Sequence, residues 1–256
     1  MAVKLLAMVI ALAVAHTLPD LARLRQFGWL ADWAGFLHGL FGARAWWAGA
    51  AGAVLLLGLP AAALFAVQNA VAGSLFGLAS LVLAVVALFY CWGPRDLDLD
   101  ADAVTHAPDA ERRRAAVVML GPDANEAGLT GTVLVDAVFR AALTRWFGVL
   151  LWFVLLGPAG ALLYRTAQLV GRHSGFEESV PPGLAAACAG LVRVLEWPAA
   201  HLITLALAVA ADFDAVAAAW RDWHASRKGG SGLDTGFLRA AARASVDADI
   251  ELEDEY

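Results

Sequence analysis

The sequence predicts an all-α membrane protein with about five transmembrane helices. Residues 47–68 and 75–92 are two apolar blocks almost free of charge, separated only by residues 69–74. Each block reaches roughly the 20 residues that a helix needs to cross a bilayer. The chain is 61% hydrophobic, and only 16% of its residues are charged, against about 25% in soluble domains. Helices that are apolar on every face suit a bilayer, which holds no water to solvate a polar flank.

The N-terminal segment is expected to form the first helix. Residues 1–15 combine Lys4, a short apolar run and Ala13-Val14-Ala15, a pattern that also describes a cleavable secretory signal; we favour an uncleaved helix. Residues 18–46 mix a few arginines with many tryptophans and phenylalanines. That composition predicts a helix lying in the membrane interface, or a belt at helix ends.

A polar loop is predicted over residues 93–138, after Gly93-Pro94 ends the third helix. It contains an acidic part from Asp96 to Asp102, a basic helix start at 111–114 and a turn around 121–123. A fourth membrane helix is expected over 146–164. Gly157-Pro158 lies inside it and should kink it.

The last apolar region, residues 183–211, is long enough to cross but contains Arg193, Glu196, Pro198 and His201. A charge at the bilayer centre costs about 2.5–3.5 kcal/mol on insertion scales. The region is therefore either one kinked crossing, which we favour, or a surface helix over 183–197 followed by a shorter helix. Residues 212–223 then predict an amphipathic helix, with Phe213 on its apolar face.

The predicted organisation has four parts. Residues 1–92 hold three membrane helices, 93–138 the polar loop, 139–225 the C-terminal membrane helices with the amphipathic helix, and 226–256 a flexible acidic tail. An N-terminus outside and a C-terminus in the cytoplasm leave only Lys4, Arg165 and Arg172 on the outer side. This orientation satisfies the positive-inside rule, and the opposite one reverses it.

Several function classes lack their signatures in this sequence. It has no phosphate-binding loop of the Walker type, no nucleophile elbow and no metal-spaced His or Cys cluster. No basic stripe suggests nucleic-acid binding. Cys91 and Cys188 lie in apolar surroundings and are interpreted as packing residues. We predict no cofactor and no metal.

Polar side chains in or beside the predicted spans are the candidate ligand-binding residues. They are Arg140, Tyr164, Arg165, Arg172, Arg193, Glu196 and His201. Tyr164, Arg165 and Arg172, with His173, end the fourth helix. Arginines there are either anchors that reach for the interface or a pocket for an anionic or carbohydrate ligand.

The other candidates form two groups. Arg193 and Glu196 have i,i+3 spacing and could pair on one helix face, near His201; ionisable residues within a span are functional candidates, although a pair that sets helix packing is an equal alternative. Arg140 and Arg145, with Asp136, enter the fourth helix. Anchoring to anionic lipid headgroups is favoured for these arginines. They could also hold the acidic part of the loop or bind a phosphorylated ligand.

The order of the motifs resembles the AmpE family, bacterial cytoplasmic-membrane proteins associated with regulation of inducible β-lactamase. Phe139-Arg140 precedes LWFVLLGPAGALLYR at 151–165, LEWPAAHL at 195–202 and ADFDAVAAAWR at 211–221. YCWGPRDL at 90–97 looks like the end of that family's third membrane helix. The resemblance covers roughly residues 75–225. It implies a multi-pass protein of the bacterial inner membrane.

AmpE proteins are in turn similar to the CbiB/CobD family, membrane enzymes of cobalamin synthesis that form an amide bond using ATP. That family has a Glu-Asn pair near Phe139-Arg140, an Asn and an Asp after the Tyr-Arg, and Pro-Ala-Arg where this chain has Pro-Ala-Ala at 198–200. ATP-driven amide formation needs carboxylates that hold Mg²⁺. The departure indicates a retained scaffold without that chemistry.

The sequence therefore predicts a non-enzymatic regulatory or sensory protein, AmpE-like, that modulates β-lactamase induction or the response to cell-wall stress. Its expected partners are the lipid bilayer, a cell-wall-derived or phosphorylated small molecule and another membrane protein, with no nucleic acid. One alternative is an ATP- and Mg²⁺-dependent amide synthase of the CbiB/CobD type, with the aspartates at 96–102 as metal ligands. A second alternative is a small-molecule transporter.

Overall fold

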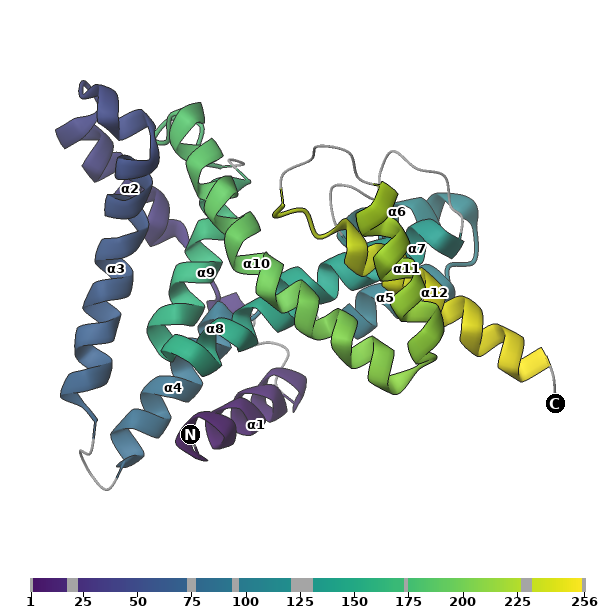
Figure 1. The fold of residues 1–256 in the computed structure, drawn as a ribbon. Coiled ribbons are helices and arrows are strands. Elements are labelled where there is room, and N and C mark those ends of the chain that lie inside the picture. Colours follow the sequence, from purple (N-terminus) through teal and green to yellow (C-terminus); the bar gives the residue numbers. More distant parts are fainter. Residues whose placement is uncertain are drawn as a thin grey trace. The chain divides into compact units, whose positions relative to one another are not determined.

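The computed structural model describes residues 2–17, 23–72, 77–93, 97–120, 131–172, 175–226 and 232–254, and within these ranges the regular structure is helical. The chain forms two compact units (Figure 1). Unit 1 comprises Met1–Pro94 and Gly148–Leu195, and unit 2 comprises Arg95–Phe147 and Glu196–Tyr256. The predicted all-α class is confirmed for the described residues.

Three helical stretches are long and apolar enough to cross a membrane: Ala50–Ala70, Gly131–Leu156 and Pro182–Ala210. Two further helices expected to span are shorter. The first helix, α1 (Ala2–Thr17), has 16 residues, and α4 (Leu78–Cys91) has 14. At 1.5 Å per residue they extend about 24 Å and about 21 Å, less than the roughly 30 Å of a bilayer core. The described residues thus contain three helices long enough to cross a membrane, against five expected spans, and one of the three, Gly131–Leu156, has bounds that differ from the expected 146–164.

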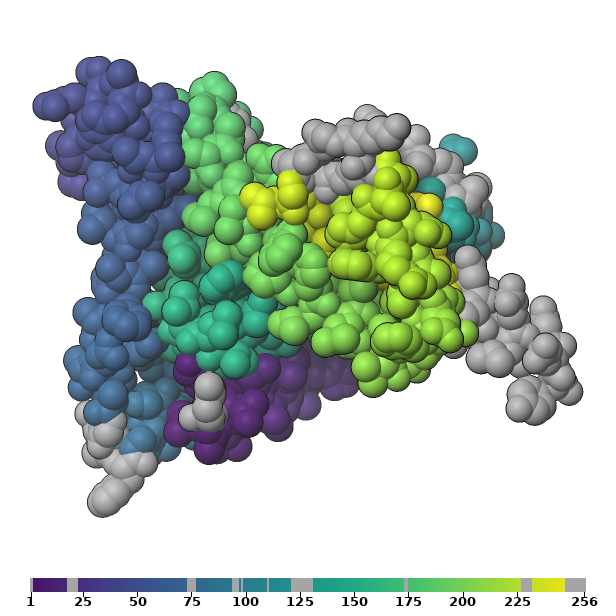
Figure 2. Space-filling view, viewed as in Figure 1, coloured from purple at the N-terminus to yellow at the C-terminus, as the bar shows by residue number. Residues whose placement is uncertain are grey.

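Unit 1 contains α1, α2 (Gly28–Phe41), the short helix η2 (Ala45–Ala48), α3 (Ala50–Ala70), α4, α8 (Gly148–Leu156), α9 (Pro158–Gly171) and the first part of α10 (Pro182–Ala210). Its core joins α2, α3, α9 and α10 around large apolar side chains such as Leu30, Trp47 and Leu56. The surface of α1 appears in purple in Figure 2, and its exposed residues include Leu5 and Val9. An exposed apolar surface of this kind fits contact with lipid.

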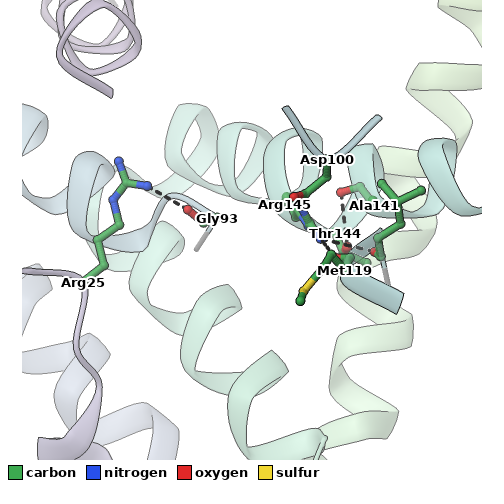
Figure 3. Close-up of polar contacts among 8 residues, drawn as sticks. Arg25, Gly93, Asp100, Met119, Ala141, Thr144 and Arg145 are labelled. Carbon is green, nitrogen blue, oxygen red and sulfur yellow. Dashed lines mark hydrogen bonds and ion pairs between the residues drawn. The ribbon is translucent and has the colours of Figure 1, made fainter. Parts of the chain in front are cut away.

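The Trp-rich segment has two apolar faces. On α2, Leu30, Ala34 and Leu37 are buried, whereas Phe36 and Leu40 are exposed. Arg25, just before α2, donates from Nη1 to the Gly93 carbonyl at 2.8 Å (Figure 3). Its guanidinium also lies 4.3 Å from the Phe89 ring centroid. These contacts tie the start of α2 to the end of α4. The predicted interfacial position of this segment stays a prediction.

The fourth membrane helix differs from the prediction. Its helical stretch begins at Gly131, as α7 (Gly131–Ala142), passes through the π-helical turn η5 (Leu143–Phe147) and ends with α8 at Leu156. Gly157 adopts φ 75° and ψ −155°, outside the helical region. Pro158 then begins α9, because proline suits the first turn of a helix. The expected kink within 146–164 is therefore a break between two helices.

The last apolar region forms α10, a single helix of 29 residues with Pro198 inside it. The alternative of a surface helix followed by a shorter helix is therefore wrong. Arg193 is exposed on α10 and Glu196 is buried. Each belongs to a different unit, so their proposed pairing stays a prediction.

Unit 2 contains α5 (Leu97–Thr105), α6 (Ala110–Leu120), α7, η5, the rest of α10, α11 (Phe213–Ser226) and α12 (Gly236–Asp254). The predicted polar loop folds into α5 and α6, whose Leu97, Val104 and Val117 pack with Ala141 of α7. The expected turn at 121–123 lies outside the described residues. Apolar residues on one face of each short helix make this packing possible.

The C-terminal region is more ordered than the predicted flexible tail. Residues 236–254 form α12, and Phe237, Leu238 and Ala241 on it are buried. The helix packs against α7 and α11. On α11, Val216 is buried, but Phe213 is 59% exposed rather than part of the packed face. The flexible tail was predicted from the acidic residues after 246. The helix packs instead through the apolar residues at its start, such as Phe237 and Leu238.

Candidate functional site

The candidate site in unit 1 lies on α9, the most deeply buried helix of that unit. It packs against α3, α4 and α8, and most of its residues from Pro158 to Val170 are buried. Small residues allow these close contacts. A Cβ added at Gly160 would lie 2.2 Å from the Trp152 carbonyl oxygen, so only glycine fits there. At 14 residues, α9 is too short to cross a bilayer alone.

Three polar side chains are connected on α9. Arg165 Nη1 donates to Gln168 Oε1 at 3.1 Å, and Gln168 Nε2 donates to the Tyr164 hydroxyl at 2.8 Å. Tyr164 is fully buried, and Arg165 and Gln168 are 4% and 3% exposed. The spacings from 164 and 165 to 168 place all three on one helix face. The structure thus joins two of the predicted residues and adds Gln168, which this spacing could have revealed.

The Tyr164 ring packs directly against Gly148 of the neighbouring helix, where there is no side chain. A Cβ at Gly148, the first residue of α8, would lie 2.2 Å from both the hydroxyl oxygen and Cζ of Tyr164. Any side chain at 148 would displace the ring, since packed interiors leave no room for such an overlap. Gly148 therefore leaves the space that the Tyr164 ring occupies. Sequence reasoning gave no sign of this contact.

The break between α8 and α9 is stabilised by side chains from two other helices. Lys4 of α1 donates from Nζ to the Val154 carbonyl at 2.7 Å and to the Leu155 carbonyl at 3.4 Å. Gln68 of α3 donates from Nε2 to the Leu156 carbonyl at 3.3 Å. The last carbonyls of a helix carry partial negative charge and have no helical partner. Lys4 and Gln68 supply those partners, so the break is a specified feature of unit 1.

The remaining candidates of unit 1 lie at the surface. Arg172 is exposed at the C-terminal end of α9, and Arg193 is exposed on α10. Gly171 packs tightly there, because an added Cβ would lie 3.0 Å from the Ala189 nitrogen of α10. His173 is outside the described residues. Arg172 and Arg193 are exposed, whereas Tyr164 and Arg165 are buried. The structure therefore does not bring Arg172 and Arg193 into the buried group on α9.

The candidates of unit 2 have different surroundings. Arg140 is exposed on α7, and Glu196 is 6% exposed. His201 is half-buried between Trp197 and Phe237, with ring centroids 4.1 and 4.2 Å away. Its Nδ1 lies 2.9 Å from the Trp197 carbonyl oxygen. His201 thus packs α10 against the start of α12, which makes its structural role the better supported one.

Arg145 has a structural role that settles one of its predicted alternatives. Its Nη1 donates to Asp100 Oδ2 of α5 at 2.6 Å, and its Nη2 donates to the Met119 and Leu120 carbonyls that end α6 (Figure 3). Arg145 is 8% exposed and Asp100 1%. A headgroup anchor would need an exposed guanidinium, so the favoured lipid role is wrong for Arg145. The alternative, holding the acidic part of the loop, is confirmed at Asp100.

The segment that carries Arg145 is a π-helical turn, η5. Such turns insert one residue into a helix and re-aim the side chains around it. Here the turn lies between α7 and α8, and its Arg145 side chain reaches both α5 and α6. The Arg145 guanidinium therefore holds both α5 and α6 against the turn η5.

No group of three or more His, Cys, Asp or Glu residues that could hold a metal ion occurs in the part of the chain that the structure describes. Comparisons with protein families, curated proteins and solved structures gave no match to this chain. The AmpE resemblance therefore stays a prediction from the motifs.

Proposed function

We propose that this chain is a multi-pass regulatory protein of the bacterial inner membrane, AmpE-like, that recognises an anionic small molecule through the Tyr164–Arg165–Gln168 group of α9. In the proposed topology it crosses the membrane about five times, with its N-terminus outside. The observation that carries the proposal is a buried arginine on a short helix that begins at a break within unit 1. Polar groups on broken helices are a recurrent way to build ligand sites in membrane proteins.

The chemistry of the group indicates the class of ligand. Arginine keeps its positive charge in proteins, and its planar guanidinium suits carboxylate and phosphate groups. Gln168 orients the Arg165 guanidinium from the same helix, and the Tyr164 hydroxyl closes the chain of hydrogen bonds. An ionisable side chain inside a membrane unit is costly and is therefore a functional candidate. A cell-wall fragment that bears carboxylates fits both this chemistry and the resemblance.

The proposal is tested by measuring β-lactamase induction in a bacterium that lacks its own AmpE-like protein. Wild-type chain is expected to alter induction by a β-lactam, and Arg165→Gln is expected to abolish that effect. Arg44→Gln is the matched control, because Arg44 is an exposed arginine of the same unit. Membrane fractionation checks that all three proteins insert. Equal induction with and without the wild-type chain would overturn the proposal.

Transport is a second candidate, favoured by the break at Gly157. Transporters commonly place substrate at discontinuous helices. Proteoliposomes loaded with the soluble fragments of a peptidoglycan digest separate the two functions. Exchange across the membrane that Arg165→Gln abolishes would favour transport over regulation. Turnover of ATP with Mg²⁺ by the purified protein would instead favour the amide-synthase alternative.

A further inference from the structure

A hydrogen bond between His38 and Trp47 closes the corner between α2 and η2 in unit 1. Trp47 Nε1 donates to His38 Nδ1 at 3.1 Å, and the two ring centroids lie 6.5 Å apart. Trp47 is fully buried, whereas His38, in the last turn of α2, is half-buried. Among the described residues, the imidazole makes no other side-chain hydrogen bond and no ion pair. The buried indole N–H therefore depends on one imidazole nitrogen.

The chemistry of indole fixes the protonation state of this imidazole. An indole N–H donates a hydrogen bond and cannot accept one, so Nδ1 of His38 must carry a free lone pair. Only the neutral imidazole has such a nitrogen, because both nitrogens of the imidazolium are donors. The hydrogen bond therefore exists while His38 is neutral and is lost when His38 takes up a proton.

The His38 ring is also confined on another side. A Cβ added at Gly42 would lie 3.1 Å from both Cε1 and Nε2 of His38, so the ring packs closely against Gly42. Protonation would place two N–H groups opposite each other, and one of them belongs to the buried Trp47 side chain. A buried donor left without an acceptor destabilises the packing around it.

Movement of Trp47 would affect two long helices, because η2 packs against the first turn of each. A Cβ added at Gly52 of α3 would lie 2.0 Å from the Trp47 carbonyl oxygen. A Cβ added at Gly183 of α10 would lie 2.3 Å from the Ala48 carbonyl oxygen. The Trp47 ring belongs to the same apolar core as Leu184 of α10. Release of the ring would therefore loosen this end of unit 1.

Charged side chains on the surrounding elements give His38 no second contact. η2 and α3 contain no ionisable residue. On α2, Asp32 precedes His38 by six residues, which places it on a different helix face, and Arg44, just before η2, is exposed. The other charged side chains on the elements of this core, none of which forms an ion pair with His38, are Arg165 and Arg172 on α9, Arg193 on α10, and Glu177 and Glu178 before α10.

We propose that His38 and Trp47 form a pH-sensitive switch, in which protonation of His38 releases Trp47 and loosens the packing of η2 against α2, α3 and α10. Histidine is the side chain that ordinarily changes charge between about pH 5 and pH 8. The hydrogen bond is present at the alkaline end of that range, where the ring is neutral, and is lost as the pH falls. The switch does not depend on the role proposed for α9.

The test follows the indole N–H of Trp47 by NMR in full-length protein that carries isotope-labelled tryptophan in detergent. The signal is assigned by its loss from Trp47→Phe. Between about pH 8 and pH 5 the wild-type signal should move upfield, because the indole loses its acceptor. In His38→Asn the side-chain oxygen can accept without titrating, so the signal should stay in place. His38→Gln, which cannot titrate either, is the second variant if His38→Asn does not fold.

Hydrogen–deuterium exchange tests the loosening itself. At about pH 5, residues 42–52 should exchange faster in wild type than in the non-titrating variant, and at about pH 8 the two should exchange equally. His16→Asn is the matched control, since His16 is an exposed histidine of the same unit, and it should behave like wild type. A Trp47 signal that does not move in wild type, or that moves equally in the non-titrating variant, overturns the proposal. Equal exchange of residues 42–52 at the acidic pH also overturns it.

Discussion

Two buried arginines, one in each unit, show how differently one residue type can be used. Arg165 of unit 1 donates to Gln168, a neutral amide on its own helix. Arg145 of unit 2 donates to the Asp100 carboxylate and to the carbonyls that end α6. The contacts of Arg145 join three helices, so they determine tertiary structure. The contact between Arg165 and Gln168 lies within α9 and orients the guanidinium there.

The largest effect is expected when the Arg145 contact is broken. Asp100→Ala leaves a buried guanidinium without its carboxylate, which typically costs about 3–5 kcal/mol. We expect a large fall in the melting temperature of detergent-solubilised protein, and rapid proteolysis within α5 and α6. Asp102→Ala, at an exposed aspartate of the same helix, should have little effect.

A double replacement sharpens this prediction. Asp100→Leu combined with Arg145→Met removes both charges and leaves apolar side chains in their place. Replacing a buried ion pair by apolar residues is often neutral, so the double variant should be more stable than Asp100→Ala. A double variant as unstable as the single one would mean that the cap on α6, rather than the uncompensated charge, dominates.

A smaller effect is expected at the contact between Gly148 and Tyr164. Gly148→Ala brings a methyl group within 2.2 Å of the ring, and overpacking of this kind costs typically about 1–3 kcal/mol. The melting temperature should fall, and the proposed effect of the chain on β-lactamase induction should weaken with it. Gly131→Ala is the control, because nothing lies within 4 Å of its added Cβ. Equal melting temperatures for the two variants would contradict the assigned role of Gly148.

The smallest effect is expected at the end of α8. Lys4→Met removes the cation that contacts the Val154 and Leu155 carbonyls. Charges at helix ends contribute about 0.3–1 kcal/mol, so the melting temperature should fall by a few degrees at most. Lys4→Arg keeps the charge and should retain most of the stability. A Lys4→Arg variant as unstable as Lys4→Met would show that charge is not the cause.

The sequence by itself determined the helical class and the apolar stretches, because hydropathy and helix length are local properties that a bilayer constrains directly. It also marked Tyr164 and Arg165, since polar groups stand out in an apolar run. For residues 146–164 it predicted one kinked helix where the structure has two helices separated at Gly157, because a glycine followed by a proline can either kink a helix or end it. That choice depends on whether partners such as Lys4 and Gln68 reach the freed carbonyls.

Only the tertiary structure decided which charges are paired. Asp100 and Arg145 are 45 residues apart, and Asp136 and Arg243 are 107 apart. Neither spacing carries a periodic signal, because ion pairs between helices depend on how the helices pack. The same reason explains why α12 was taken for a tail. Its acidic composition is visible in the sequence, whereas the burial of Phe237 depends on the rings of His201 on α10 and of Trp223 and His224 on α11 that pack against it.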